Sequence, residues 1–105
     1  MTIDDYLMPG EEIRFSSSTK MRYGEKQYQV FVTNRRLLMY ARRGAIIKSD
    51  DVVSIQLGEL HGVKYKEEGL IVRQGVLEFQ GKTLVQLTGP AKDAKALYQQ
   101  VMQFL

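Results

Sequence analysis

The stretch Tyr28-Gln-Val-Phe-Val-Thr-Asn-Arg-Arg-Leu-Leu-Met-Tyr40 contains two runs of strand-forming residues separated by a short polar segment. Residues 30–32 lead into the polar segment 33–36, and residues 37–40 lead out of it. Branched and aromatic side chains favour strands, and Asn within a polar break favours a tight turn. We therefore predict a β-hairpin. No catalytic group lies within it, so it points to a fold and, through the fold, to a binding role.

On both sides of this hairpin, nine glycines divide the chain into short segments, a pattern typical of an all-β meander. We expect Asp50-Asp51 to form a corner, Gly75 to mark a bulge inside its strand, and Leu84 to face inward together with Val85 or Leu87. The segmentation predicts seven strands, over residues 12–21, 27–33, 36–42, 45–49, 60–67, 70–80 and 83–88.

In the last part of the chain, the spacing of the apolar residues changes. Thr88-Gly89-Pro90 is a suitable helix start, because proline is tolerated in the first turn. Apolar residues then recur at three- and four-residue spacing, which predicts a helix over about residues 90–105 that packs against the sheet. The apolar stripe consists of Ala94, Leu97, Tyr98, Val101, Met102 and Leu105, and the opposite face carries Lys92, Asp93, Lys95, Gln99 and Gln103.

The composition is that of a folded protein and fits a reducing compartment. With 105 residues, 44% hydrophobic and 26% charged, we expect one domain over residues 1–105. The chain has no cysteine, which excludes disulfides and thiolate metal sites. The acidic N-terminus does not resemble a secretion signal, and the longest apolar run, residues 37–41, is far shorter than the ~20 residues of a membrane helix. We expect a cytoplasmic protein without a transmembrane segment.

The net charge of +3 hides a strongly basic third of the chain. Residues 20–48 hold eight basic residues and one acidic residue, so this segment carries +7 and the rest of the chain carries −4. Such asymmetry can attract phosphates, lipid headgroups or an acidic protein surface. The alternative is a set of solvated strand edges that are kept charged against aggregation. The basic residues are Lys20, Arg22, Lys26, Arg35, Arg36, Arg42, Arg43 and Lys48.

No pattern of catalytic or metal-ligating residues is present in the sequence. The stretch from Gly75 to Thr83 resembles a phosphate-binding loop, but five residues separate its glycines where the motif has four, and strand-like segments flank it. His61 is the only histidine and cannot build a multi-histidine metal site. The acidic pairs, Glu11-Glu12 among them, are expected in turns and caps. We therefore predict no catalytic residue, no metal site, no cofactor and no enzymatic activity, and no nucleic-acid motif is present.

The order of elements and several motifs together resemble the bacterial pleckstrin-homology (PH) and GRAM-like domains. The resemblance rests on Pro9-Gly-Glu-Glu-Ile13, on Val30-Phe-Val-Thr-Asn-Arg-Arg-Leu-Leu38, and on Ile46-Ile-Lys-Ser-Asp50 followed by Val53-Ser-Ile55. It implies a mainly β fold: a PH-like, partly open barrel of seven antiparallel strands in two near-orthogonal sheets, capped by one C-terminal α-helix. Strands would occupy about residues 12–88 and the helix about residues 90–105.

The resemblance also implies where a ligand would bind. In PH folds the loops after the first, third and sixth strands gather at one end, and headgroup-binding members carry basic residues there. These loops would hold Arg22, Lys26, Arg42, Arg43 and Lys82 as candidate anion-binding residues. Arg35 and Arg36 would lie at the opposite, helix-capped end as polar turn residues.

Two binding roles follow from this resemblance. The first is a protein-interaction or scaffold domain whose partner is another protein or itself, as a homo-oligomer. The second is weak binding to an anionic lipid surface through the basic loop cluster, since a basic residue near such a surface gains ~1 kcal/mol.

Overall fold

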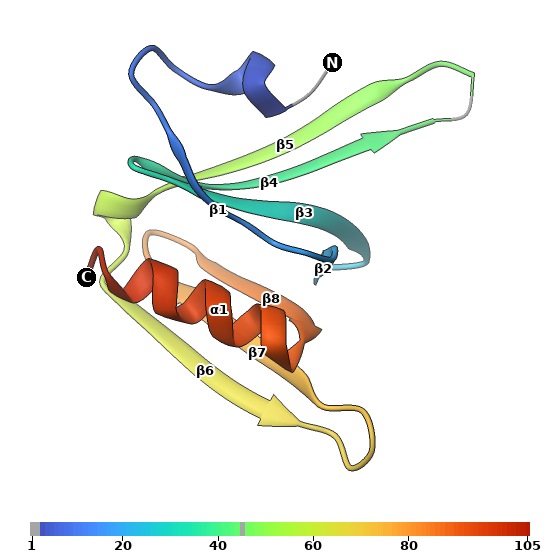
Figure 1. The fold of residues 1–105 in the computed structure, drawn as a ribbon, viewed down its shortest axis with the longest axis vertical. Helices are drawn as coiled ribbons and strands as arrows, with labels where there is room; N and C mark the ends of the chain where they lie inside the picture. Colours follow the sequence, from blue (N-terminus) through green and yellow to red (C-terminus); the bar gives the residue numbers. More distant parts are fainter. Residues whose placement is uncertain (1–2, 45) are drawn as a thin grey trace.

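In the computed structural model, which describes residues 3–44 and 46–105, the predicted hairpin consists of β3 (Lys26–Thr33) and β4 (Arg36–Arg43). The other strands are β1 (Ile13–Ser16), β2 (Met21–Tyr23), β5 (Ser49–Gln56), β6 (Gly62–Glu68), β7 (Gln74–Gln80) and β8 (Leu84–Pro90). Two 3₁₀ turns, η1 (Ile3–Tyr6) and η2 (Leu57–Glu59), and the helix α1 (Ala91–Met102) complete the fold (Figure 1).

All strand pairs are antiparallel, and the strand order is β5-β4-β3-β2-β8-β7-β6, with β1 also paired to β3. Strand β3 belongs to both sheets: it pairs with β1 and β4 in one and with β2 in the other. Among the described residues β5 and β6, at the two ends of the order, do not pair with each other, so the barrel stays open. The predicted mainly β fold, an open antiparallel barrel with one C-terminal helix, is confirmed, although the described residues form eight strands and not seven.

The hairpin is buried on both of its faces. Val30, Val32, Leu37 and Met39 point into the main core, where the buried face of α1 also packs. Phe31 and Leu38 point to the other face and form a second cluster with Ile3 of η1. A strand that is covered on both faces reads as a continuous apolar run instead of an alternating one. The N-terminal segment therefore explains why this stretch of sequence is so uniformly apolar.

An ion pair between Glu11 and Arg36 attaches that N-terminal segment to the hairpin. Arg36 donates from Nη2 to Glu11 Oε1 at 2.6 Å and from Nε to Oε2 at 2.9 Å, and its Nη2 also donates to the carbonyl of Tyr6 at 2.8 Å. The hydroxyl of Thr33 and the backbone N–H of Met8 complete the shell around the carboxylate. We expected Glu11 in a turn or cap and Arg36 as a polar turn residue; the structure corrects both, because the Glu11 side chain is fully buried.

The predicted first strand is divided into two. Residues 17–20 interrupt it, so that β1 pairs in one sheet and β2 in the other. The hydroxyl of Ser17 accepts a hydrogen bond from the backbone N–H of Val30 at 3.0 Å. The hydroxyls of Ser18 and Thr19 donate hydrogen bonds to the carboxylate of Asp93 in α1. Asp93, expected on the exposed face of the helix, is buried; burial raises its pKa, but these hydrogen bonds outweigh that effect and leave the pKa lowered.

The fourth predicted strand, residues 45–49, is wrong in its placement. The strand is β5, and it pairs with β4 from Arg36↔Gln56 to Arg43↔Ser49. Asp50 and Asp51 lie within it, not at a corner, because tyrosine hydroxyls satisfy their carboxylates: Tyr6 and Tyr40 donate to Asp50, and Tyr28 donates to Asp51. Ala45, the first residue of the predicted strand, lies outside the described residues.

The sixth predicted strand, residues 70–80, begins later than expected and contains no bulge. β7 runs from Gln74, and Gly75 pairs in regular register with Glu67 and Gly89. Gly75 is needed for a different reason: a Cβ there would lie 2.4 Å from the Cβ of Ala94 on α1, so glycine permits the close approach of helix and sheet. In β8, Val85 and Leu87 are buried as expected, whereas Leu84 is exposed.

The buried ion pair generates the first prediction. Hydrogen bonds from Arg36 are the main cause that lowers the pKa of Glu11 from 4.5 to about 2, against the opposing effect of burial. Because the folded-state pKa is lowered, the stabilisation is present above the unfolded pKa and is lost as the pH falls from about 4.5 towards 2. We expect Glu11→Gln to lower the free energy of unfolding by about 2–3 kcal/mol at pH 7 and to flatten its decline below pH 5.

Urea denaturation at pH 7 and at pH 3 measures both effects. Glu12→Gln is the matched control, since Glu12 is the adjacent carboxylate and is exposed. Equal losses of stability in the two variants would contradict the assigned role of Glu11.

The glycine at the helix–sheet contact generates the second prediction. We expect Gly75→Ala to destabilise the fold by about 1–3 kcal/mol, because the added methyl group overlaps Ala94 and also touches the Tyr65 ring. Gly58→Ala is the control, since a Cβ at Gly58 meets no atom within 4 Å. In thermal or urea unfolding, the double variant Gly75→Ala, Ala94→Gly should lose less unfolding free energy than the two single variants lose in sum. If the two losses were additive, a direct clash between these positions would be contradicted.

Candidate anion-binding face

Four of the five predicted anion-binding residues lie on the side of the molecule where the β2–β3 and β4–β5 hairpins end. Arg22 belongs to β2, Lys26 begins β3, and Arg42 and Arg43 end β4 (Figure 1). Lys82 is separate. It lies in the β7–β8 turn, where its Nζ is 3.7 Å from Glu59 of η2.

The position of Lys82 corrects the expected gathering of three loops. The η2 turn lies beside the β3–β4 turn, since the backbone N–H of Leu57 donates to the carbonyl of Arg35. Because antiparallel neighbours reverse direction at each turn, the turns after β6 and after β7 lie at opposite ends of this sheet. The β6–β7 turn, not the β7–β8 turn, therefore projects on the side of Arg22 and Lys26 (Figure 1).

Arg43 is held by its neighbours in the sheet. Its guanidinium lies 5.0 Å from the centre of the Tyr28 ring, and its Nε is 3.6 Å from Asp51 Oδ2. Its Nη2 also donates to the carbonyl of Gln27 at 3.4 Å. Arg42 lies opposite Asp50 in the β4–β5 register, and its charge contributes to lowering the pKa of Asp50, after the stronger effects of the Tyr6 and Tyr40 hydroxyls. These arginines brace β3, β4 and β5.

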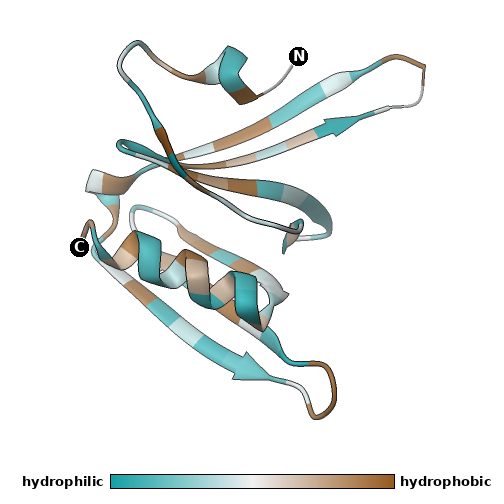
Figure 2. Ribbon diagram, in the orientation of Figure 1, coloured by the Kyte–Doolittle hydropathy of each residue, from teal (hydrophilic) through white to brown (hydrophobic). Residues whose placement is uncertain are grey.

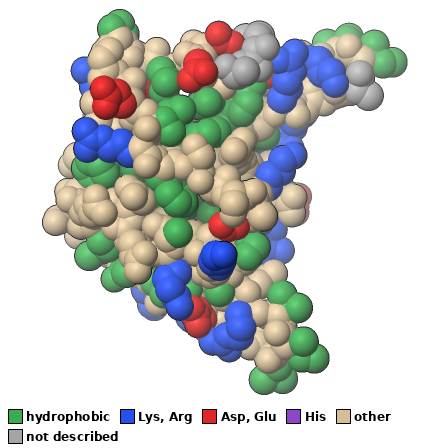
Figure 3. All heavy atoms as spheres, in the orientation of Figure 1, with side chains coloured by type: hydrophobic (Ala, Val, Ile, Leu, Met, Phe, Trp, Pro, Cys, Tyr) green, Lys and Arg blue, Asp and Glu red, His purple; other side chains and the backbone are tan. Residues whose placement is uncertain are grey.

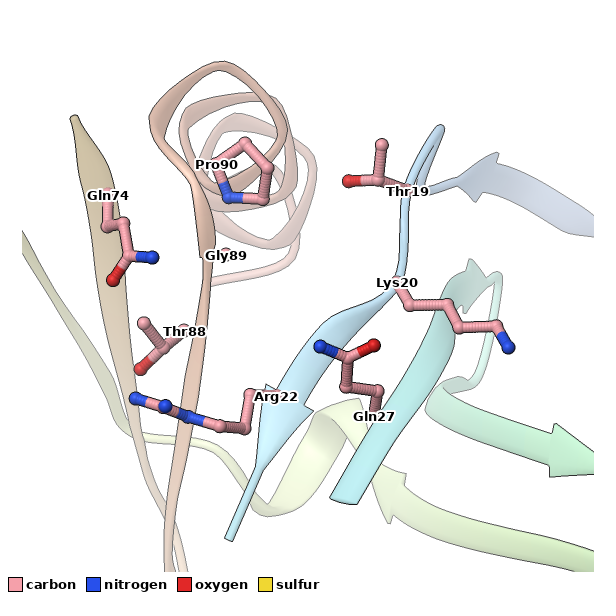
Figure 4. A pocket seen from close by; sticks show the side chains of 8 residues that line it. All are labelled: Thr19, Lys20, Arg22, Gln27, Gln74, Thr88, Gly89 and Pro90. Carbon is pink, nitrogen blue, oxygen red and sulfur yellow. The ribbon is translucent and has the colours of Figure 1, made fainter. Parts of the chain in front are cut away.

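A polar hollow lies at the seam between the two sheets. Strands β2 and β8 pair only at Arg22↔Thr88, and a hollow of about 240 Å³ opens on one side of this pair. A second hollow of about 320 Å³ lies against the same two residues and is also lined by Gly24 and Gln86. The first hollow is lined by Thr19, Lys20, Arg22, Gln27, Gln74, Thr88, Gly89 and Pro90 (Figure 4).

The side chains of the first hollow are suited to an anion. Figure 4 shows the Arg22 guanidinium and the Gln74 amide on either side of the Thr88 side chain, whereas the Lys20 side chain extends away from them. Guanidinium, amide and hydroxyl groups can all donate to phosphate or carboxylate oxygens, and the Arg22 guanidinium supplies charge-assisted hydrogen bonds. No carboxylate from residues 3–44 or 46–105 lines the hollow. The arrangement can therefore hold an anionic group, with Arg22 as its principal charged donor.

Sequence reasoning found Arg22 but missed Lys20, Gln27, Gln74 and Thr88 as lining residues. Lys20 could have been found, because it lies two positions before Arg22 in the same basic segment. Gln74 and Thr88 carried no signal, since they reach the hollow only through the pairing of β7 with β8 and of β8 with β2.

The described residues include no group of three or more His, Asp or Glu side chains that could hold a metal ion. His61, which precedes β6, lines neither hollow. None of the helices in the described part of the chain is long and apolar enough to cross a membrane.

Comparison with known proteins agrees with the fold. The sequence pattern of a family described as bacterial PH domain matches residues 7–101. The chain is structurally similar to a pleckstrin homology domain from Shewanella amazonensis SB2B, with a TM-score of 0.68 over 97% of this chain and 90% of that chain, at 13% sequence identity. No curated protein matches the chain by sequence.

The different surroundings of two arginines generate a prediction about stability. Replacement of Arg43 by Gln removes the ring contact with Tyr28 and the half-exposed pair with Asp51, and should cost about 1 kcal/mol of unfolding free energy. Replacement of the exposed Arg22 by Gln should change that free energy by no more than about 0.5 kcal/mol. Urea denaturation of both variants measures the difference. A larger loss of stability for Arg22→Gln would contradict the view that Arg43 stabilises the sheet and that Arg22 faces a ligand.

Proposed function

Because the chain belongs to the bacterial PH domain family, whose fold is typically a non-catalytic binding module, we propose that it binds an anionic, phosphate-bearing surface and has no enzymatic activity of its own. The observation that carries this proposal is the seam hollow beside Arg22, which is lined by Arg22, Lys20 and neutral hydrogen-bond donors and, within the described part of the chain, by no carboxylate. A phosphate group needs this combination of positive charge and multiple donors.

The charge around the hollow supports the same role. Lys20, Arg22 and Lys26 are exposed on one hairpin, and the only acidic residue between them is Glu25. At an anionic membrane each basic residue contributes about 1 kcal/mol, so three give weak and reversible attachment. In the cytoplasm, where we place the protein, this attachment would depend strongly on ionic strength.

A protein-interaction or self-association role is the second candidate, and the sheet edges favour it. Strands β5 and β6 end the strand order and pair on one side only among the described residues. An unpaired edge offers backbone hydrogen-bonding groups to another chain, so copies of this domain could associate as a homo-oligomer. Native mass spectrometry over a range of concentrations tests this candidate, and a monomer throughout would count against it.

Charge reversal on the β2–β3 hairpin tests the anion-binding role. We expect the double variant Arg22→Glu, Lys26→Glu to lose at least about tenfold in affinity for vesicles of phosphatidylcholine mixed with phosphatidylglycerol, because two attractive charges become repulsive. The same variant should also lose the NMR shift changes that inorganic phosphate produces around Arg22 and Thr88 in the unmodified protein.

Lys82→Glu is the matched control, since it reverses a charge at the opposite end of the barrel. Added salt should weaken binding of the unmodified protein and of Lys82→Glu alike. If the double variant Arg22→Glu, Lys26→Glu bound vesicles and phosphate as tightly as the unmodified protein and Lys82→Glu do, the proposed function would be wrong.

A further inference from the structure

Two hairpins end in aliphatic side chains that no other described residue covers. We call residues 46–47 of the β4–β5 turn the first tip and residues 70–72 of the β6–β7 turn the second tip. Their side chains are between 73% and 102% exposed, far more than a large apolar residue usually is. Figures 2 and 3 show both tips as apolar ends of extended hairpins. The tip residues are Ile46, Ile47, Leu70, Ile71 and Val72.

The two turns that carry the tips share one sequence pattern. Each turn begins with a glycine, continues with three apolar residues and ends with a basic residue: Gly44-Ala-Ile-Ile-Lys48 and Gly69-Leu-Ile-Val-Arg73. Both glycines have a positive φ, +96° and +110°, and a Cβ on either would lie 2.0 or 2.1 Å from a carbonyl oxygen of the same turn. The same apolar turn therefore occurs twice, in hairpins from opposite ends of the strand order.

Both tips project on the same side of the molecule. In Figure 1 the β4–β5 and β6–β7 turns lie at the right, near the two ends of the long axis, which extends 39 Å. The β2–β3 hairpin, with Arg22 and Lys26, lies between them on that side (Figure 1). Along this side of the molecule an apolar tip, a basic hairpin that is set back from both tips, and a second apolar tip therefore follow one another (Figures 1 and 3).

We propose that both tips insert into an anionic lipid bilayer, with Lys20, Arg22 and Lys26 against its headgroups. This inference rests on the proposed function and identifies the anionic surface as a membrane. The tips would place aliphatic side chains at the headgroup–acyl boundary, and Lys48, which follows the first tip, would remain among the headgroups. Arg73, which follows the second tip, pairs with Glu67 at 3.2 Å.

The shape of the tips and their charge both favour a bilayer over a protein partner. Two narrow apolar tips far apart would require two separate matching pockets in a protein, whereas a bilayer accepts aliphatic side chains at any position. The cations between and beside the tips complement anionic headgroups. Basic residues alone give weak attachment, and a second, apolar contact is what makes membrane binding stable.

Tryptophan substitution tests insertion directly. The chain contains no tryptophan, so Ile47→Trp and Ile71→Trp each introduce a single fluorophore. With vesicles of phosphatidylcholine mixed with phosphatidylglycerol, we expect a blue-shifted emission in both variants and quenching by lipids that carry bromine on their acyl chains. Leu84→Trp is the control: Leu84 is also exposed, but it is the first residue of β8, next to the β7–β8 turn at the opposite end, and its emission should not change. An unshifted, unquenched emission from both tip reporters would refute insertion.

Removal of the tips separates this inference from the proposed function. We expect serine at positions 46 and 47, or at 70, 71 and 72, to lower vesicle binding at least about tenfold and to leave inorganic phosphate binding unchanged. Vesicle binding as tight as that of the unmodified protein would overturn the inference while the proposed function stands. The proposed function is tested separately, by phosphate binding in the double variant Arg22→Glu, Lys26→Glu.

The oligomeric state shows whether the tips contact a second copy of the chain and not a membrane. If the serine variants converted an oligomer into a monomer while vesicle binding stayed the same, the tips would be self-association surfaces and the membrane inference would be wrong. Light scattering on the same variants gives this result. Because the substituted side chains are exposed, the variants should fold as the unmodified protein does, which circular dichroism checks.

Discussion

The buried ion pair between Glu11 and Arg36 is the interaction on which the rest of the fold depends. It joins the segment before β1 to the turn that begins β4, and Thr33 and Tyr6 supply further hydrogen bonds to the same two side chains. The attached segment covers the outer face of the central hairpin, so Phe31 and Leu38 are buried. Without this cover the hairpin would expose an apolar face, and a charge left unpaired in its place would be costly.

The same arrangement gives the barrel two different ends. At one end the chain satisfies its own polar groups: Arg36 with Glu11, Lys82 with Glu59, and η2 against the β3–β4 turn. At the other end the hairpins project with basic and apolar side chains that the described residues leave exposed. Since a folded chain normally buries its aliphatic residues, the exposed end is where a binding partner has most to gain.

Local patterns were enough to predict much of the fold. The hairpin of β3 and β4, the C-terminal helix and the open, mainly β barrel were all predicted, because strand-forming runs, turn residues and helical spacing act over a few residues. Residues 45–49 and 70–73 were placed in strands for the same reason, since aliphatic residues favour strands wherever they occur. No local pattern indicates that Ile46 and Ile71 stay exposed among the described residues.

The sequence by itself therefore determined the order of elements, the motifs of the N-terminal segment and hairpin, and the concentration of positive charge in one third of the chain. Tertiary structure alone decided that Glu11 faces Arg36, that Lys82 lies apart from Arg22, that Gln74 and Thr88 line the seam hollow, and that two apolar turns project on one side. These relations join residues far apart in the chain, and they depend on how the strands pair, which no short segment of sequence specifies.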